Sequence, residues 1–209
     1  MMKVLLVLAG EPPDESLLDW RAETADFVIA VDGGMNALIH AGIQPDLLVG
    51  DFDSFDPSTS GSVSCKVIRE EDQDSTDLEK ALRHLPGDEA PDEIVLLGAT
   101  GGRSDHFLTN LLVASSLPEA SKVALDATDE IIQRATPACS VSLIGMSGKT
   151  VSLLPLSSCE GVATEGLRWE LTDVAMGPGI LLGQSNEAVS EKVSVSLRVG
   201  NLFVITPKN

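Results

Sequence analysis

The chain has 209 residues, of which 43% are hydrophobic, so it can bury one large core or two small ones. Its 32 acidic and 14 basic residues give a formal net charge of −18, which argues against nucleic acid or an anionic membrane as a partner, because both bind clustered Lys and Arg. The three cysteines have no paired spacing and no apolar run approaches the length of a membrane span, so we expect a cytoplasmic protein with reduced thiols.

Apolar runs alternate with segments of helical periodicity over about the first 125 residues. The runs that predict buried strands are at residues 4–9, 27–31, 47–49, 65–68, 94–97 and 123–125. The segments that predict helices are at residues 35–41, 76–85 and 106–116. Continuously apolar strands separated by helices are typical of a parallel sheet covered on both faces. We therefore predict an N-terminal, Rossmann-like α/β domain that binds its ligands beyond the carboxyl ends of the strands.

The pattern changes after about residue 130. Residues 193–199 alternate strictly between apolar and polar side chains, residues 139–144 and 150–155 resemble them, and Gly, Pro and Ser recur at short intervals. This pattern is typical of a small antiparallel β-sandwich or barrel. We take the sandwich, and expect two domains that comprise residues 1–126 and 127–209.

Two aspartates, Asp51 and Asp53, follow the predicted strand at residues 47–49. Side chains one residue apart on an extended segment point the same way. Crowded carboxylates repel each other unless a cation lies between them, and Mg²⁺ prefers oxygen ligands. The pair therefore indicates metal-assisted phosphoryl chemistry, and the alternative is a solvated turn favoured by Ser54 and Pro57.

A second acidic cluster occupies residues 72–77 and strengthens the interpretation as a metal site. Asp74 and Asp77, at the start of a predicted helix, can turn toward the same edge of the sheet, and Lys80 would share that face and suit a phosphate oxygen. The alternative is structural, because an Asp, Ser or Thr of this cluster can be the helix N-cap. In that case the glutamate three residues past Thr76 completes a capping box.

Two glycine-containing loops leave predicted strands and enter helices. In Asp32-Gly33-Gly34-Met35-Asn36 the glycines let backbone N–H groups approach a phosphate or ribose. The loop at residues 98–106 contains Arg103, whose planar guanidinium can bind phosphate oxygens in pairs. The alternative for the first loop is a tight turn between strand and helix. For the second loop, the alternative is that Ser104 or Asp105 is the N-cap of the helix and that His106 has a structural role.

The second half contains one aromatic candidate, Trp169, beside a polar turn that includes Ser185 and Asn186. An exposed tryptophan can stack against a flat, cationic heterocycle. The alternative is that Trp169 packs in the core of the sandwich.

Taken together, these motifs resemble the thiamine pyrophosphokinase family over nearly the whole chain. They occur in order as Asp32-Gly33-Gly34-Met35-Asn36, Gly50-Asp51-Phe52-Asp53-Ser54, residues 72–77 with Lys80, Gly101-Gly102-Arg103-Ser104-Asp105-His106, and then residues 152–155, 164–171 and 185–187. Each motif alone has little specificity, whereas seven of them in register are highly specific.

The resemblance implies an ATP-binding α/β domain and a C-terminal β-sandwich that helps to bind thiamine. It implies transfer of the β,γ-pyrophosphoryl group of ATP to the hydroxyl of thiamine, which gives thiamine diphosphate and AMP, with Mg²⁺ as cofactor and ATP as co-substrate. It also implies a homodimer with each active site built between subunits. An acidic edge suits this reaction, because it attracts a cationic thiazolium and repels a nucleotide unless Mg²⁺ is bound.

The resemblance also assigns roles to single residues. Asp51, Asp53, Asp74 and Asp77 would form the catalytic metal and phosphate site, and one of them, which the sequence leaves open, would accept the hydroxyl proton. Arg103 and Lys80 would hold phosphates. The groups expected to position nucleotide or metal are Asp32, Gly33, Gly34, Asn36, Ser54, Thr76, Asp105 and His106. The expected thiamine contacts are Gln73, Trp169, Ser185 and Asn186.

Two other functions use parts of the same pattern. A metal-dependent phosphohydrolase would use the same carboxylates to activate water, but it would leave the motifs of the second half without a purpose. A sensor of nucleotide or thiamine without catalytic activity would be expected to lack one of the acids or Arg103, and all of them are present.

Overall fold

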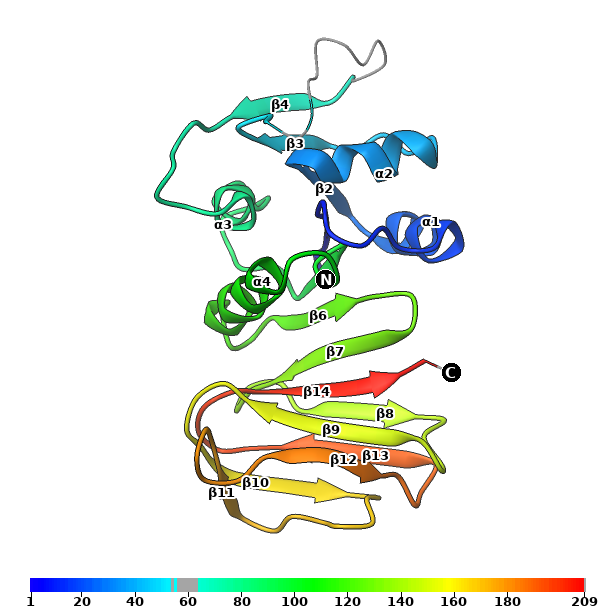
Figure 1. The fold of residues 1–209 in the computed structure, drawn as a ribbon, viewed down its shortest axis with the longest axis vertical. Helices are drawn as coiled ribbons and strands as arrows, with labels where there is room; N and C mark the ends of the chain where they lie inside the picture. The colour runs from blue at the N-terminus through cyan, green and yellow to red at the C-terminus, as the bar shows by residue number, and fades with distance from the viewer. Residues whose placement is uncertain (54, 56–63, 209) are drawn as a thin grey trace. The chain divides into compact units, whose positions relative to one another are not determined.

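The computed structural model describes residues 1–53, 55 and 64–208, which form two compact units (Figure 1). Unit 1 comprises Met1–Val113 and Leu125–Thr128, and unit 2 comprises Ala114–Ala124 and Asp129–Asn209. The chain therefore enters unit 2 near the end of a helix and returns briefly to unit 1 before it forms the rest of unit 2. Within the described residues, no helix is both long and apolar enough to cross a lipid bilayer.

The sheet of unit 1 is parallel, with the strand order β5-β1-β2-β3-β4. In the register of its central pairs, Val4 of β1 lies opposite Phe27 of β2 and Ile94 of β5. The predicted parallel sheet is confirmed. The strand bounds are β1 Lys3–Val7, β2 Phe27–Val31, β3 Leu47–Gly50, β4 Lys66–Arg69 and β5 Glu93–Leu97.

Helices cover both faces of this sheet, which explains its continuously apolar strands. Alternate strand residues such as Leu5 and Leu48 join Met35 and Leu38 of α2 in one buried cluster. The intervening residues point to the opposite face, where α3 contacts β2 and β3. The helices are α1 Glu15–Thr24, α2 Met35–His40, α3 Asp77–Leu82 and α4 Ser104–Ser116.

One expectation for unit 1 is wrong, and one helix was not predicted. The strand predicted at residues 65–68 is not buried: β4 is the last strand of the sheet, and Lys66, Val67 and Arg69 are exposed. A strand at the edge pairs on one side only, and charged residues are common there. Helix α1 was not expected because its apolar periodicity is weak, with Leu18 as its one buried residue.

Unit 2 contains antiparallel strands in the two orders β12-β9-β14-β7 and β11-β10-β13-β8. Their alternate residues, such as Val151, Val193 and Val204, form one buried cluster, so the predicted antiparallel β-sandwich is confirmed. Its strand bounds are β7 Glu130–Ala135, β8 Val141–Ile144, β9 Thr150–Pro155, β10 Cys159–Glu165, β11 Val174–Met176, β12 Gly183–Glu187, β13 Lys192–Ser196 and β14 Leu202–Pro207. Strand β6, Lys122–Asp126, begins in unit 2 and ends in unit 1.

Candidate active site

Asp32 lies at the carboxyl end of β2, in the 3₁₀ turn Asp32–Gly34 that precedes α2. It is 3% exposed, and its backbone has a φ of +43°, a conformation that costs a non-glycine residue on the order of 1–3 kcal/mol. Gly50, at the end of the neighbouring strand β3, provides the space: a Cβ on Gly50 would lie 2.9 Å from Oδ1 of Asp32. The missing side chain of Gly50 therefore lets the end of β3 approach this buried carboxylate.

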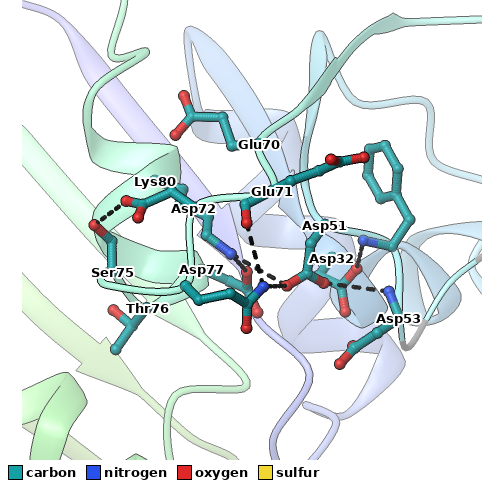
Figure 2. A network of polar contacts seen from close by, with 12 residues as sticks. Asp32, Asp51, Asp53, Glu70, Glu71, Asp72, Ser75, Thr76, Asp77 and Lys80 are labelled. Atoms are coloured by element: carbon teal, nitrogen blue, oxygen red, sulfur yellow. Dashed lines mark hydrogen bonds and ion pairs between the residues drawn. The ribbon is translucent and has the colours of Figure 1, made fainter.

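Asp51 and Asp53, which follow β3, lie beside Asp32 (Figure 2). One carboxylate oxygen from each of the three aspartates lies within 4.8 Å of the other two. Backbone groups orient two of these side chains: Phe52 N donates to Oδ1 of Asp32 at 3.1 Å, and Asp53 N donates to Oδ1 of Asp51 at 3.2 Å. Three carboxylate oxygens at this spacing fit a hard divalent cation such as Mg²⁺. The sequence paired Asp51 with Asp53, and the structure adds Asp32 to the same cluster.

A buried lysine connects this cluster to α3. The side chain of Lys80 is 3% exposed, and its Nζ lies 2.9 Å from Oδ1 of Asp77 and 3.3 Å from Oδ2 of Asp51. Burial alone lowers the pKa of Lys80, but the hydrogen bonds from Nζ to Asp77 and Asp51 outweigh it and raise the pKa above its usual value. For Asp51 burial likewise acts to raise the pKa, and the bonds from Asp53 N and Lys80 bring it below the usual value. Both charges are therefore stabilised.

The predicted ligands of the second acidic cluster take different positions. Asp77 is bound to Lys80, and Asp74 is exposed, with its backbone N–H donating to Oδ1 of Asp72 at 2.9 Å. Within the part of the chain that the structure describes, the three-carboxylate cluster does not extend to either residue. Gln73 reaches the cluster from this loop, with its Nε2 3.5 Å from Oδ2 of Asp51.

Thr76 is the N-cap of α3. Its Oγ1 accepts a hydrogen bond from Glu79 N at 3.3 Å, and Oε2 of Glu79 accepts one from Thr76 N at 2.9 Å. The capping box that the sequence offered as an alternative is confirmed. The hydroxyl of Thr76 also donates to Oε2 of Glu79 at 2.9 Å.

Arg83, which follows α3, organises the acidic loop at residues 70–76, and the sequence interpretation missed it. Its guanidinium donates to Oε2 of Glu70 at 2.9 Å, to Oδ2 of Asp72 at 3.3 Å, and to the hydroxyl of Ser75. Hydrogen bonds from His84 and Arg83 lower the pKa of Glu70, and those from Ser75, Asp74 N and Arg83 lower the pKa of Asp72. One signal in the sequence could have indicated Arg83: it is a basic residue that follows a short helix with an acidic first turn.

The turn at Gly33 and Gly34 lies against the end of β1. A Cβ on Gly34 would lie 1.9 Å from the carbonyl oxygen of Val7, so no larger residue fits there. Asn36 is exposed and its Nδ2 donates to the Gly33 carbonyl at 3.0 Å. A hollow of about 880 Å³ lies beside this turn, lined by Gly33, Asn36, residues 8–10 and the start of α1, and its size is within the range of small-molecule sites.

Arg103 and Asp105 flank the start of α4 and bind each other. Their side chains are 73% and 62% exposed, and Nη2 of Arg103 lies 2.6 Å from Oδ2 of Asp105. This pairing raises the pKa of Arg103 and lowers the pKa of Asp105. His106 is exposed, and its backbone N–H donates to Oδ1 of Asp105 at 3.1 Å. Ser54, also predicted at the nucleotide site, is outside the described residues.

Three predicted thiamine contacts lie in unit 2. Ser185 and Asn186 belong to β12, and Trp169 lies on a loop that is hydrogen-bonded to this strand. Trp169 is 60% exposed, so the alternative that it packs in the core is wrong. Ser185 has a φ of +58° and its N–H donates to Oγ of Ser152 at 2.9 Å. Asn186 is 8% exposed, and its side chain binds the backbone of Trp169.

Comparison with known proteins gives two family matches. A model of the thiamin pyrophosphokinase catalytic domain matches residues 19–125, and a model of the thiamin pyrophosphokinase vitamin B1 binding domain matches residues 138–202. A thiamine pyrophosphokinase 1 from Oryza sativa is 30% identical, with 98% of this chain and 87% of the relative covered. A thiamine pyrophosphokinase from Bacillus subtilis is 28% identical, with 98% of each chain covered.

Solved structures agree with the sequence relatives. The crystal structure of the Bacillus subtilis thiamine pyrophosphokinase matches with a TM-score of 0.81 at 27% identity over 99% of each chain. A thiamin pyrophosphokinase from Candida albicans shares the fold, with a TM-score of 0.83 at 19% identity over 100% of this chain and 89% of that one. Family models, relatives and structures therefore agree, and the chain belongs to the thiamin pyrophosphokinase family.

Proposed function

We propose that this protein is a thiamine diphosphokinase that transfers the pyrophosphoryl group of ATP to the hydroxyl of thiamine, giving thiamine diphosphate and AMP. The observation that carries the proposal is the cluster of Asp32, Asp51 and Asp53, whose carboxylate oxygens lie within 4.8 Å of one another at the carboxyl ends of β2 and β3. This is where ligands bind in open α/β sheets. Membership of the family and the coverage of 98% of the Bacillus subtilis relative support the same activity.

The three carboxylates would hold Mg²⁺, since they provide hard oxygen ligands. A bound Mg²⁺ neutralises charge on the phosphates that are transferred and displaced. The protein contributes orientation: Phe52 N and Asp53 N hold the carboxylates of Asp32 and Asp51, and Lys80 holds Asp51 from the other side. Asp77 acts through Lys80 in this arrangement.

Asp74 stays a predicted ligand of metal or phosphate. It lies on the loop that Arg83 organises, and the same loop contains Gln73, which reaches Asp51.

ATP would occupy the hollow beside Gly33 and Asn36. Gly34 lets this turn pack directly against the end of β1, where a side chain would not fit. Arg103 would bind phosphate oxygens by exchanging its exposed partner Asp105 for them.

Thiamine would stack its cationic ring against Trp169, whose side chain is largely exposed. Ser185, which has a φ of +58° and lies where the pairing of β12 with β9 is irregular, would add a hydroxyl, and Gln73 would contribute from the acidic loop. We further propose a homodimer with active sites at the subunit interface. The exposed apolar residues Ile180, Leu181 and Leu182 support an interaction surface on unit 2.

A cytoplasmic location completes the proposal. The three cysteines, Cys65, Cys139 and Cys159, are free thiols, which suits a reducing compartment.

The test is incubation with Mg-ATP, with and without thiamine, followed by separation of the nucleotides and thiamine species. We expect AMP and thiamine diphosphate in equal amounts, formed only when thiamine is present. Phosphate release without thiamine would instead indicate a phosphohydrolase. Elution by size with light scattering tests the dimer, and a monomer at the enzyme concentration of the assay would contradict it.

A further inference from the structure

A buried side-chain amide on β12 binds the backbone of the exposed tryptophan. Asn186 is 8% exposed. Its Nδ2 donates to the carbonyl oxygen of Trp169 at 2.8 Å, and its Oδ1 accepts from Trp169 N at 3.2 Å and from Glu187 N at 2.8 Å. Both polar atoms of the amide are therefore engaged inside the protein.

Only an amide can make this set of bonds. An Asn side chain offers a donor and an acceptor on one short stem, so it can bind the N–H and the C=O of one residue as a neighbouring strand would. Aspartate keeps the acceptor and loses the donor, and alanine loses both. The Asn186 amide is therefore well suited to bind the backbone of Trp169.

The rest of the loop is attached to β12 independently of Asn186. Leu167 is 2% exposed and forms an isolated β-bridge with Ala188. Arg168 N donates to the carbonyl of Glu187 at 2.8 Å, and the Arg168 guanidinium lies 2.8 Å from the Glu187 carboxylate. Loss of the Asn186 side chain should therefore loosen Trp169 without releasing the loop that contains it.

We propose that Asn186 is a positioning residue for Trp169 and does not itself contact thiamine. By holding the backbone on both sides of Cα, it restricts the ring before the ligand arrives, so that less side-chain freedom is lost on binding. This inference rests on the proposed function, since it takes thiamine as the cation that stacks on Trp169. It replaces the direct contact with thiamine that the family resemblance implies for Asn186.

The experiment uses the full-length chain in a Trp20→Phe background, in which Trp169 is the only tryptophan. Three variants are compared there: Asn186→Ala, Asn186→Asp and the matched control Asn201→Ala. Asn201 is a partly buried asparagine of the same unit whose Nδ2 donates to the Ser115 carbonyl at 3.3 Å. The readouts are the fluorescence anisotropy of Trp169 without ligands, and the KM for thiamine, the KM for ATP and kcat.

For Asn186→Ala we expect lower anisotropy and a thiamine KM raised roughly 3- to 10-fold, which corresponds to the loss of one or two net hydrogen bonds. The ATP KM and kcat should stay within about twofold, because only stacking is weakened. Asn186→Asp should fall between alanine and the wild type, and Asn201→Ala should leave both readouts unchanged. Adding Asn186→Ala to Trp169→Ala should raise the thiamine KM no further, since the two residues act as one unit.

Two results would overturn the inference. A raised thiamine KM with unchanged anisotropy would mean that Asn186 contacts thiamine directly. Lower anisotropy with an unchanged thiamine KM would mean that the order of Trp169 does not matter for binding. Anisotropy requires no substrate, so it decides the link between Asn186 and Trp169 even if thiamine-dependent AMP formation by the wild type fails and the proposed function with it.

Discussion

Asp32 depends on the small size of Gly50. A Cβ on Gly50 would lie 2.8 Å from Cβ of Asp32 and 2.9 Å from its Oδ1, whereas the φ of Gly50 is not in the left-handed region and suits alanine. Gly50→Ala should therefore displace the carboxylate with a stability cost of about 1–3 kcal/mol. Since a misplacement of 1 Å can cost on the order of 100-fold in rate, kcat/KM should fall by roughly 10- to 100-fold.

The control for Gly50→Ala is Gly177→Ala, where the new Cβ would meet its nearest neighbour at an ordinary 3.4 Å. Steady-state kinetics and urea unfolding separate the two effects. Equal losses of activity in both variants, or none in Gly50→Ala, would mean that this contact does not position Asp32.

Lys80 is a buried cation between two carboxylates that would otherwise repel each other. Lys80→Met should destabilise the fold by about 1–2 kcal/mol, less than for a fully buried pair, because the Asp51 and Asp77 side chains are 19% and 37% exposed. It should also leave the acidic site with more uncompensated charge. Mg²⁺ should then raise the melting temperature of Lys80→Met by more than that of the wild type, as scanning calorimetry with and without the metal would measure. An equal rise in melting temperature in both proteins would mean that Lys80 and Mg²⁺ do not interact with the same carboxylate, Asp51.

At the scale of elements, the acidic loop at residues 70–76 is tied to the turn after α3 by Arg83. The pKa values of Glu70 and Asp72 are lowered in the folded protein, so the stability that these groups contribute is present above their unfolded pKa values and is lost as the pH falls through the folded ones. Arg83→Met should therefore lower the urea midpoint at neutral pH, and the difference from the wild type should shrink in acid.

Arg83→Lys is the matched variant, because it keeps the charge and loses the planar fork. It should recover part of the stability but less of the order in the loop, which hydrogen exchange of the loop amides would report. A difference from the wild type that is constant from neutral to acidic pH would contradict the ion-pair account.

The same scale shows where local pattern predicts an element and where it does not. The capping box at Thr76 and Glu79 was readable, because the residues that form it are neighbours in sequence. Helix α1 was not, since its single buried residue, Leu18, gives no periodicity. The exposure of β4 was not readable either, because an apolar run does not say whether a strand is central or at the edge.

At the scale of the whole molecule, the parallel order of β5-β1-β2-β3-β4 brings together side chains that are distant in sequence. The pair Asp51 and Asp53 could be predicted from spacing alone, and Asp32 could be placed at the same edge. That Asp32 joins the cluster depends on the adjacency of β2 and β3 and on the close contact with Gly50. The partners of Arg83 and of the Asn186 amide could not be predicted, because tertiary contacts determine them.

The central claim is that Asp32, Asp51 and Asp53 form one site for metal-dependent pyrophosphoryl transfer. The most direct test is thiamine-dependent AMP formation by Asp32→Asn, beside the wild type and Asp19→Asn, a control at an exposed aspartate of α1. Asparagine keeps the oxygen that accepts from Phe52 N and removes the charge. We predict a loss of about 100-fold or more in kcat for Asp32→Asn, with folding intact and Asp19→Asn unchanged. Activity of Asp32→Asn within a few-fold of the wild type would contradict the claim.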